Sequence, residues 1–73
     1  MNFPEEIKKL RERALLTQTE FAELVGVAFS TVNRWEAGKA RSNIKAMKNI
    51  KAYCEKNGLP YETVDEAWLI FDV

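Results

Sequence analysis

Apolar residues recur every three or four positions along most of the chain, which is the pattern of helices that bury one face. The first stripe predicts a helix that begins around Asn2 or Phe3 and ends at about Arg13. Asn2 can cap this helix, and Glu5 and Glu6 suit the positive end of its dipole. The residues predicted to point inward are Phe3, Ile7, Leu10 and Ala14.

Two short helices joined by a tight turn are predicted between Thr17 and Gly38. The first opens on a capping box, in which Thr17 and Glu20 can each bond the other's backbone amide. Gly26 falls at the turn, where a residue without Cβ adopts the left-handed conformation with little strain. The residues expected to form the apolar face of this helix are Phe21, Ala22, Leu24 and Val25.

The second of these helices begins just after Gly26. Val32 and Trp35 are three positions apart and are expected to point inward, which leaves a largely polar outer face. The residues expected on that outer face are Phe29, Ser30, Asn33 and Arg34. Two short helices, a glycine turn and a polar outer face together suggest a helix-turn-helix.

A fourth helix is predicted after the polar connection that follows Gly38. Ser42 or Asn43 can cap it, and Asn57-Gly58 provides a left-handed exit. Its apolar stripe is predicted to hold Ile44, Met47, Ile50 and Cys54. A separate basic strip on the same helix holds Lys45, Lys48 and Lys56.

A fifth amphipathic helix is predicted over roughly Tyr61 to Phe71. Pro60 lies near its start, and acids in the early turns suit the helix dipole. The predicted apolar side consists of Val64, Ala67, Trp68 and Phe71. Trp68 and Phe71 suggest an interface with a second copy, because aromatic residues are favoured at interface centres. The alternative is that Trp68 closes the core beneath the fourth helix.

The run LTQTEFAELVGVAFSTVNRWEAGKA, residues 16–40, resembles the DNA-binding domain of the Cro and phage-repressor family of helix-turn-helix regulators. The landmarks that carry the resemblance are Leu16, Gln18, Ala22, Val25, Gly26, Val27, Trp35, Glu36 and Gly38. The resemblance implies a compact all-α bundle of short helices whose third helix enters the major groove, usually as a dimer. Residues 1–73 are long enough for one domain, with its core at about 4–58 and the C-terminal helix at about 61–71.

The resemblance also implies roles for individual residues. Gln18 would hold a phosphate, and Thr31 is expected to contact another. The residues that would face the groove are Ala28, Phe29, Ser30, Asn33 and Arg34. Arg34 is the candidate for reading guanine through O6 and N7, and Asn33 for reading adenine. Finally, a partly buried ion pair between Arg11 and Glu36 is expected to tie the first helix to the end of the third.

Some positions leave alternatives open. Ala28 stands where the family commonly has Ser or Thr, which weakens the helix cap by about 1 kcal/mol and removes an expected phosphate contact. Phe29 either packs on a thymine methyl or folds back over Val27 or Val32. The basic residues that either hold phosphates or form a solvated face are Lys39, Arg41, Lys45 and Lys48.

The charge distribution qualifies a formal net charge of zero. Residues 1–58 contain all eleven basic residues and seven acids, whereas residues 59–73 contain four acids, including Asp72, and no base. Phosphate binding depends on this local field rather than on the sum. No run approaches the roughly 18 apolar residues of a membrane span, and the N-terminus lacks the apolar core of a signal peptide. A cytoplasmic protein is therefore expected.

The function classes that remain are two kinds of binding protein. The favoured class is a regulator of double-stranded DNA, expected to be a homodimeric repressor. The alternative is an antitoxin or adaptor that binds a protein partner through the acidic, aromatic C-terminal helix. An enzyme, a metal site or a cofactor is not expected, because the chain has one cysteine, no histidine and no phosphate-cradling glycine loop.

Overall fold

The computed structural model describes residues 2–71 and contains five helices. Their bounds are α1 Phe3–Arg13, α2 Gln18–Val25, α3 Phe29–Glu36, α4 Ile44–Asn57 and α5 Glu62–Ile70. No strand occurs between residues 2 and 71. The all-α fold predicted from the apolar stripes is confirmed. Asp72, counted above among the acids of the C-terminal segment, lies outside the described residues.

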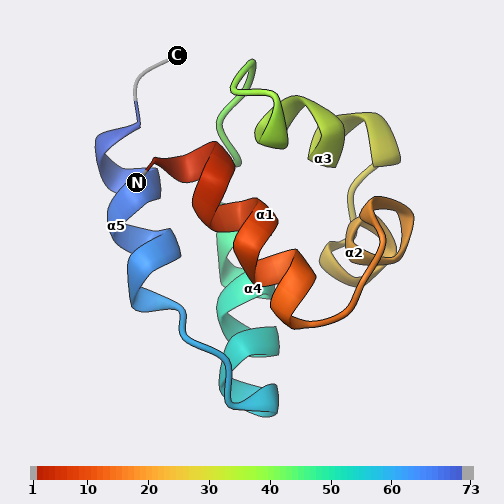
Figure 1. The fold of residues 1–73 in the computed structure, drawn as a ribbon, viewed down its shortest axis with the longest axis vertical. Helices are drawn as coiled ribbons and strands as arrows, with labels where there is room; N and C mark the ends of the chain where they lie inside the picture. Colours follow the sequence, from red (N-terminus) through yellow and green to blue (C-terminus); the bar gives the residue numbers. More distant parts are fainter. Residues whose placement is uncertain (1, 72–73) are drawn as a thin grey trace.

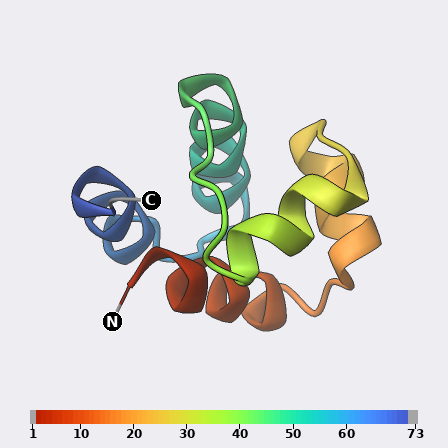
Figure 2. The same ribbon diagram turned by 90° about the horizontal axis from the view of Figure 1, so that it is seen from above.

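The five helices are arranged around α1. Figure 1 shows α1 across the front of the molecule, with α5 on one side of it, α2 and α3 on the other, and α4 behind. The view from above places α4 on the far side from α1, with the α3–α4 connection passing between them (Figure 2). α1 therefore separates α5 from the pair α2 and α3. α5 can be linked to that pair only through the α3–α4 connection or through core side chains.

Polar side chains fix the starts of three helices. Asn2 caps α1, and Thr17 and Glu20 form both hydrogen bonds of the predicted capping box, at 3.1 and 2.9 Å. Of the two candidates at α4, Asn43 is the cap, and its side chain accepts a backbone hydrogen bond of 2.8 Å, whereas Ser42 is buried. Because caps bond residues only a few positions away, the sequence pattern predicted the caps of α1 and α2 and narrowed that of α4 to two neighbours.

The connection from α1 to α2 contains a left-handed residue that is not glycine. Leu15 has φ +60° and its side chain is 90% exposed. A Cβ in this conformation costs roughly 1–2 kcal/mol, and an exposed side chain recovers little of that cost by burial. α1 nevertheless ends at Arg13, where the apolar stripe predicted.

One core joins all five helices. Its buried apolar side chains are Phe3, Ile7, Leu10, Phe21, Ala22, Val25, Val32, Trp35, Ala46, Met47, Ile50, Cys54, Val64 and Ala67. The ring of Phe3 is fully buried and packs edge-on against Trp35, with 6.4 Å between ring centroids. Through Phe3, the first turn of α1 bridges the end of α3 to the rest of the core.

Two residues assigned to buried faces are exposed instead. Leu24 is 39% exposed because the buried residues of α2 are Phe21, Ala22 and Val25, and Leu24 lies at the edge of the face they form. Ile44 is 63% exposed because it is the first residue of α4 and projects beyond the core, where Ala46 takes the buried position.

α5 is one residue shorter at each end than predicted, since Tyr61 and Phe71 flank it as cap positions. It packs on α1, and the ring of Phe71 lies 5.8 Å from that of Phe3. Val64 and Ala67 are buried, whereas Trp68 and Phe71 are half-buried against the core. None of the helices within residues 2–71 has the length and apolar character required of a membrane-spanning segment.

Candidate nucleic-acid interface

The turn between α2 and α3 is built from local geometry and one distant contact. Gly26 has φ +84°, and its amide bonds the carbonyl of Ala22 at 2.9 Å to close α2. A side chain at Gly26 would meet nothing closer than 3.8 Å, so the left-handed φ is what requires glycine. From α4, Asn49 donates a 2.8 Å hydrogen bond to the carbonyl of Val25. α4 therefore supports the turn that sets the angle between α2 and α3.

α3 has an inner and an outer face, as its spacing predicted. Val32 and Trp35 are buried and attach the helix to the core. The outward residues that are exposed are Ala28, Phe29, Ser30, Asn33 and Arg34, and Thr31 is half-buried beside them. Ala28 provides no side-chain cap for the helix. The face thus offers an aromatic ring, a hydroxyl, an amide and a guanidinium.

Phe29 is the exposed apolar member of this face. Half of its side chain is accessible to solvent, although it is the first residue of a helix whose inner face is buried. A phenyl ring exposed to this extent can still contact an apolar group such as the methyl of thymine. The exposed half of the ring is available for such a contact.

A chain of hydrogen bonds joins α2 to α3. Gln18, the first residue of α2, donates its side-chain amide to Glu36 Oε1 at 3.1 Å. Its side-chain oxygen accepts a hydrogen bond of 3.4 Å from Asn33. Gln18 is therefore engaged within the protein on both sides, and a phosphate contact through its amide would require it to exchange one of these bonds.

Arg11 and Glu36 form the ion pair that ties α1 to the end of α3. Arg11 donates from Nε to Glu36 Oε2 at 2.7 Å and from Nη2 to Glu36 Oε1 at 3.0 Å. Its Nη1 donates to the carbonyl of Leu16 at 2.9 Å. The hydrogen bond with Glu36 raises the pKa of Arg11, and burial opposes that rise only in part. All three guanidinium nitrogens are thus used inside the protein.

Cations gather where α3 leads into α4. Lys39, Arg41 and Lys45 are exposed, and none of them forms an ion pair with another residue of the described chain. Arg34 on α3 is likewise exposed and without an ion pair there. In Figure 1, α3 and the connection that follows it lie along the upper edge of the molecule. Their charges are therefore available to an anionic surface on that side.

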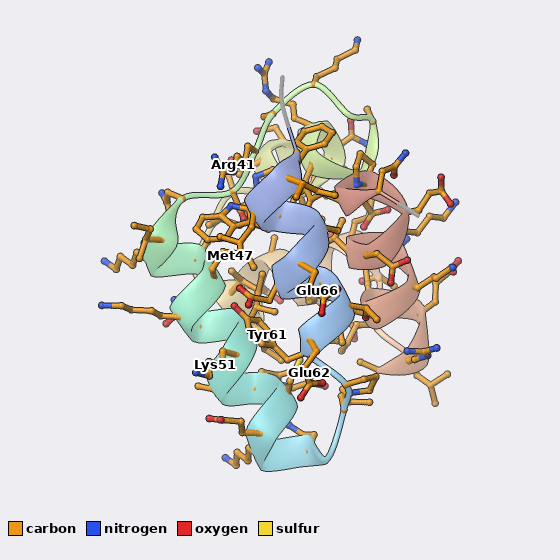
Figure 3. All side chains as sticks on the ribbon, turned by 90° about the vertical axis from the view of Figure 1, so that its left-hand side faces the viewer. Arg41, Met47, Lys51, Tyr61, Glu62 and Glu66 are labelled. Carbon is orange, nitrogen blue, oxygen red and sulfur yellow. The ribbon has the colours of Figure 1, made fainter. Side chains whose placement is uncertain are left out.

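Arg41 differs from the other cations because it contacts α5. Its guanidinium carbon lies 4.4 Å from the centroid of the Trp68 ring. The indole N–H of Trp68 donates a 2.7 Å hydrogen bond to the carbonyl of Ser42, the next residue. In the side view, Arg41 lies near the upper end of the molecule, and Glu66 and Glu62 lie below it along α5 (Figure 3).

The other potentially reactive side chains among residues 2–71 are not arranged as a catalytic or metal site. Burial is the main cause that raises the pKa of the Cys54 thiol, which keeps this thiol protonated and unreactive near neutral pH. Among residues 2–71, no three acidic or cysteine side chains lie close enough to hold a metal ion. Tyr61 also has a raised pKa, chiefly from burial and then from the charge of Asp65.

A profile described as helix-turn-helix matches residues 7–57. The chain belongs to this family. The matched region covers α2, α3, α4 and most of α1, so the helix-turn-helix predicted from the run between Thr17 and Gly38 is confirmed. α5 lies beyond the matched region.

A curated relative of this helix-turn-helix chain is the HTH-type transcriptional activator BcrR of Enterococcus faecalis. The two are 34% identical over 53 residues, which cover 73% of this chain and 26% of the relative. The chain therefore spans about a quarter of the length of that protein. No solved structure matches the chain with comparable significance.

Two contacts at this surface of the helix-turn-helix had no signal in the sequence pattern. Asn49 lies beside the apolar stripe of α4 and reads as an ordinary solvated amide, yet it holds the turn after α2. The size of Trp68 predicts an apolar contact, but its bond to Ser42 and its stack with Arg41 depend on where α5 packs.

Proposed function

We propose that this chain is a sequence-specific regulator of transcription that binds double-stranded DNA and reads the major groove with α3. The observation that carries the proposal is the two-sidedness of α3 in a helix-turn-helix. Val32 and Trp35 fix the helix to the core, while Asn33 and Arg34 are exposed on its outer face. Amide and guanidinium groups are the side chains that recognise adenine and guanine by paired hydrogen bonds.

The cations beside α3 supply the second requirement of DNA binding, which is neutralisation of phosphates. Lys39, Arg41 and Lys45 are exposed and without ion pairs among residues 2–71. We assign them to the DNA backbone, together with Thr31 at the edge of the outer face and, after exchange of a hydrogen bond, Gln18. These contacts would set the register of α3 in the groove, and base contacts would set the specificity.

Within this proposal, repression by occupation of an operator is the mode of regulation that the resemblance to Cro and phage repressors supports. The curated relative is named as an activator. A reporter gene separates the two: with the selected site placed over the promoter, expression should fall when the chain is present. Expression that rises instead would identify an activator.

Selection of bound duplexes from a random pool tests the DNA-binding proposal and returns the site. Replacing Arg34 with Ala should then cost about 1–3 kcal/mol at one base pair and relax the preference there. Lys45→Ala should weaken all duplexes alike and lower the salt dependence of binding. Lys56→Ala is the matched control, because Lys56 is an exposed lysine at the opposite end of α4.

The outcomes discriminate between readers, phosphate contacts and bystanders. A selected site that is unchanged by Arg34→Ala would remove Arg34 as a reader. Equal effects of Lys45→Ala and Lys56→Ala would mean that net charge, rather than the surface around α3, governs binding. Failure of the unaltered chain to enrich any duplex would overturn the proposal.

An observation on α5 favours a second kind of partner. Leu69 and Ile70 are 60% and 78% exposed on its outer face, on the same helix as the exposed acids Glu62 and Glu66. Trp68 and Phe71 are already half-covered by the chain itself, so their remaining surface forms only part of such an interface. We propose that a second copy covers this end of α5. An antitoxin or adaptor function would place a different protein there.

Sedimentation tests the homodimer directly. The double substitution Leu69→Lys and Ile70→Lys should turn a dimer into a monomer without unfolding it, because both side chains are exposed. A far-ultraviolet circular dichroism spectrum provides the folding control. A chain that sediments as a monomer at high concentration before any substitution would exclude a dimer in the absence of DNA.

A further inference from the structure

We propose that Trp68 is a positioning residue for the DNA surface, because it holds the Arg41 guanidinium ready for a backbone phosphate. This inference rests on the proposed function and extends it to α5, which lies outside the family match that ends at residue 57. It assigns to α5 a role in binding DNA in addition to its role in closing the core.

Trp68 contacts two consecutive residues of the α3–α4 connection in different ways. Its indole N–H donates to the carbonyl of Ser42 at 2.7 Å, which fixes the backbone. Its ring lies against the Arg41 guanidinium, 4.4 Å from ring centroid to guanidinium carbon, which fixes the side chain. Asn43, the cap of α4, follows directly in the sequence. The two contacts of Trp68, which we call the Trp68 clamp, therefore also fix the start of α4.

The stack leaves the hydrogen-bond donors of Arg41 without a partner among residues 2–71. A guanidinium that stacks on a ring uses its flat face, while its five N–H groups point outwards in its own plane. Arg41 has no hydrogen bond or ion pair to a protein acceptor among residues 2–71, in contrast to Arg11, whose three nitrogens are all engaged. Arg41 is therefore oriented, and its donors have no acceptor within residues 2–71, as in a preorganised anion-binding group.

The position of Arg41 matches that role. It lies three residues after Gly38, which has φ +76° and closes α3 together with the bond from the amide of Lys39 to the carbonyl of Arg34. α3 and this connection form the upper edge in Figure 1, and the C-terminal end of α5 rises beside them. A duplex held against the outer face of α3 thus has its backbone within reach of the connection.

The two interactions of Trp68 can be separated by substitution. Trp68→Phe removes the N–H donor but keeps an aromatic face for Arg41, whereas Trp68→Leu removes both. Each is measured with and without Arg41→Ala for binding to the selected duplex over a range of salt concentrations. Trp68→Leu is also combined with Lys45→Ala as a control, because Lys45 has no contact with the ring. Thr63→Ala controls for changes to α5 as such, because Thr63 is an exposed residue of α5 that belongs to neither proposed contact surface.

If the Trp68 clamp positions Arg41 for a phosphate, each variant has a specific expected result. Arg41→Ala should lower the slope of log affinity against log salt by about 0.9, the value for one phosphate contact. Trp68→Leu should weaken binding by about two- to fivefold, the equivalent of an exposed cation–π contact. That loss should vanish when Arg41 is already Ala and persist when Lys45 is Ala. Trp68→Phe should retain most of the affinity, and Thr63→Ala all of it.

Two results would overturn the inference although the chain binds DNA. The first is an equal loss from Trp68→Leu with and without Arg41, which would make Trp68 a core residue only. The second is an unchanged salt slope in Arg41→Ala, which would mean that Arg41 touches no phosphate. Both leave the proposed function intact, whereas the absence of any enriched duplex with the unaltered chain removes the proposed function first.

A measurement without DNA tests the stack of Arg41 on Trp68 directly. It can be read from the unaltered chain even if the Trp68→Leu variant does not fold. The side-chain protons of Arg41 should show upfield ring-current shifts in nuclear magnetic resonance spectra of the unaltered chain. Trp68→Phe should retain part of these shifts and Trp68→Leu should abolish them. Unshifted Arg41 protons in the unaltered, folded chain would show that the guanidinium does not rest on the ring and would overturn the inference.

Discussion

α2 and α3 are both eight residues long, but they are held in different ways. α2 is fixed at both ends by its own neighbourhood, through the Thr17–Glu20 capping box and the left-handed Gly26. α3 has no side-chain cap at Ala28, and its far end is held by Arg11 from another helix. The ends of α2 are therefore fixed locally, whereas the end of α3 depends on a tertiary contact.

This difference suits the proposed division of work between the two helices. A helix of eight residues is too short to persist alone in water, so its packing decides whether it is populated. α3 buries Val32 and Trp35 and is joined to α1 by the ion pair at Glu36. These contacts do not use the side chains of its outer face. The contacts that hold α3 thus lie away from the side chains proposed to touch DNA, apart from the bond between Asn33 and Gln18.

The strongest way to break α3 from the body is to remove one partner of its ion pair. Arg11→Met or Glu36→Leu alone should destabilise the fold by about 3 kcal/mol, because each leaves a charge with little access to solvent and no opposite charge beside it. Glu36 is the more buried partner, with a side chain 6% exposed. Thermal or urea unfolding of the single variants provides the measurement.

The double variant Arg11→Met and Glu36→Leu sharpens that experiment. It should lose less stability than either single variant, since apolar side chains of similar size incur no penalty for an isolated charge. Gln18 loses its acceptor on Glu36 in this variant, but it is only half-buried and can turn to water. Small and additive effects of the two single substitutions would show instead that the pair is two independent surface charges.

At α2, the corresponding change removes a local cap, and the expected loss of stability is smaller. Thr17→Ala removes one bond of the capping box and should lower the free energy of unfolding by about 1 kcal/mol. Thr19→Ala is the matched control, because Thr19 is an exposed threonine of the same helix with no cap to make. Equal losses from Thr17→Ala and Thr19→Ala would contradict the role given to the cap.

The connection that leads into α2 can be improved. Leu15→Gly should stabilise the fold by about 1 kcal/mol, because glycine adopts φ +60° without the clash of a Cβ. The gain is limited by the larger backbone freedom of glycine in the unfolded chain. Gly26→Ala, which places a Cβ at φ +84°, is the opposite change and should destabilise by a similar amount. A Leu15→Gly variant that melts earlier than the unaltered chain would refute the strain at this residue.

α3 can be given the cap that it lacks. Ala28→Ser places a hydroxyl at the N-cap, where the backbone is already extended with φ −72° and ψ 152°. The change should stabilise the fold by about 0.5–1 kcal/mol. If unfolding experiments show no gain, then the start of α3 is held by its neighbours so firmly that a local cap adds nothing.

The smallest expected effect lies outside both helices, at alkaline pH. Burial raises the pKa of Cys54 and Tyr61 in the folded chain, so their stabilising contribution is present below the unfolded values and is lost as pH rises through the folded ones. Urea midpoints should therefore fall above about pH 8.5. Cys54→Ala should reduce the fall from about pH 8.5 and Tyr61→Phe from about pH 10. The same pH dependence in both variants would count against this cause.

The order of the residues was enough to predict the five helices, most of their ends and most of their buried faces. Caps at Asn2 and Thr17 and the turn at Gly26 involve residues within a few positions of each other, so their geometry follows from the order of the residues alone. Periodicity also separated the inner face of α3 from its outer face. It failed at Leu24 and Ile44, because periodicity shows which side of a helix is apolar but not how far the core extends along it.

Tertiary structure alone decided the contacts that join these helices into a surface. The bonds from Asn49 to Val25, from Arg11 to Glu36 and from Trp68 to Ser42 span 24, 25 and 26 positions. The resemblance to a family suggested the second of these but not its geometry, and nothing suggested the other two. An amide beside an apolar stripe or a tryptophan on an apolar face has the same pattern whether or not an acceptor lies opposite. Only the packing of α4 beneath the turn and of α5 beside the α3–α4 connection places those carbonyls within hydrogen-bond distance.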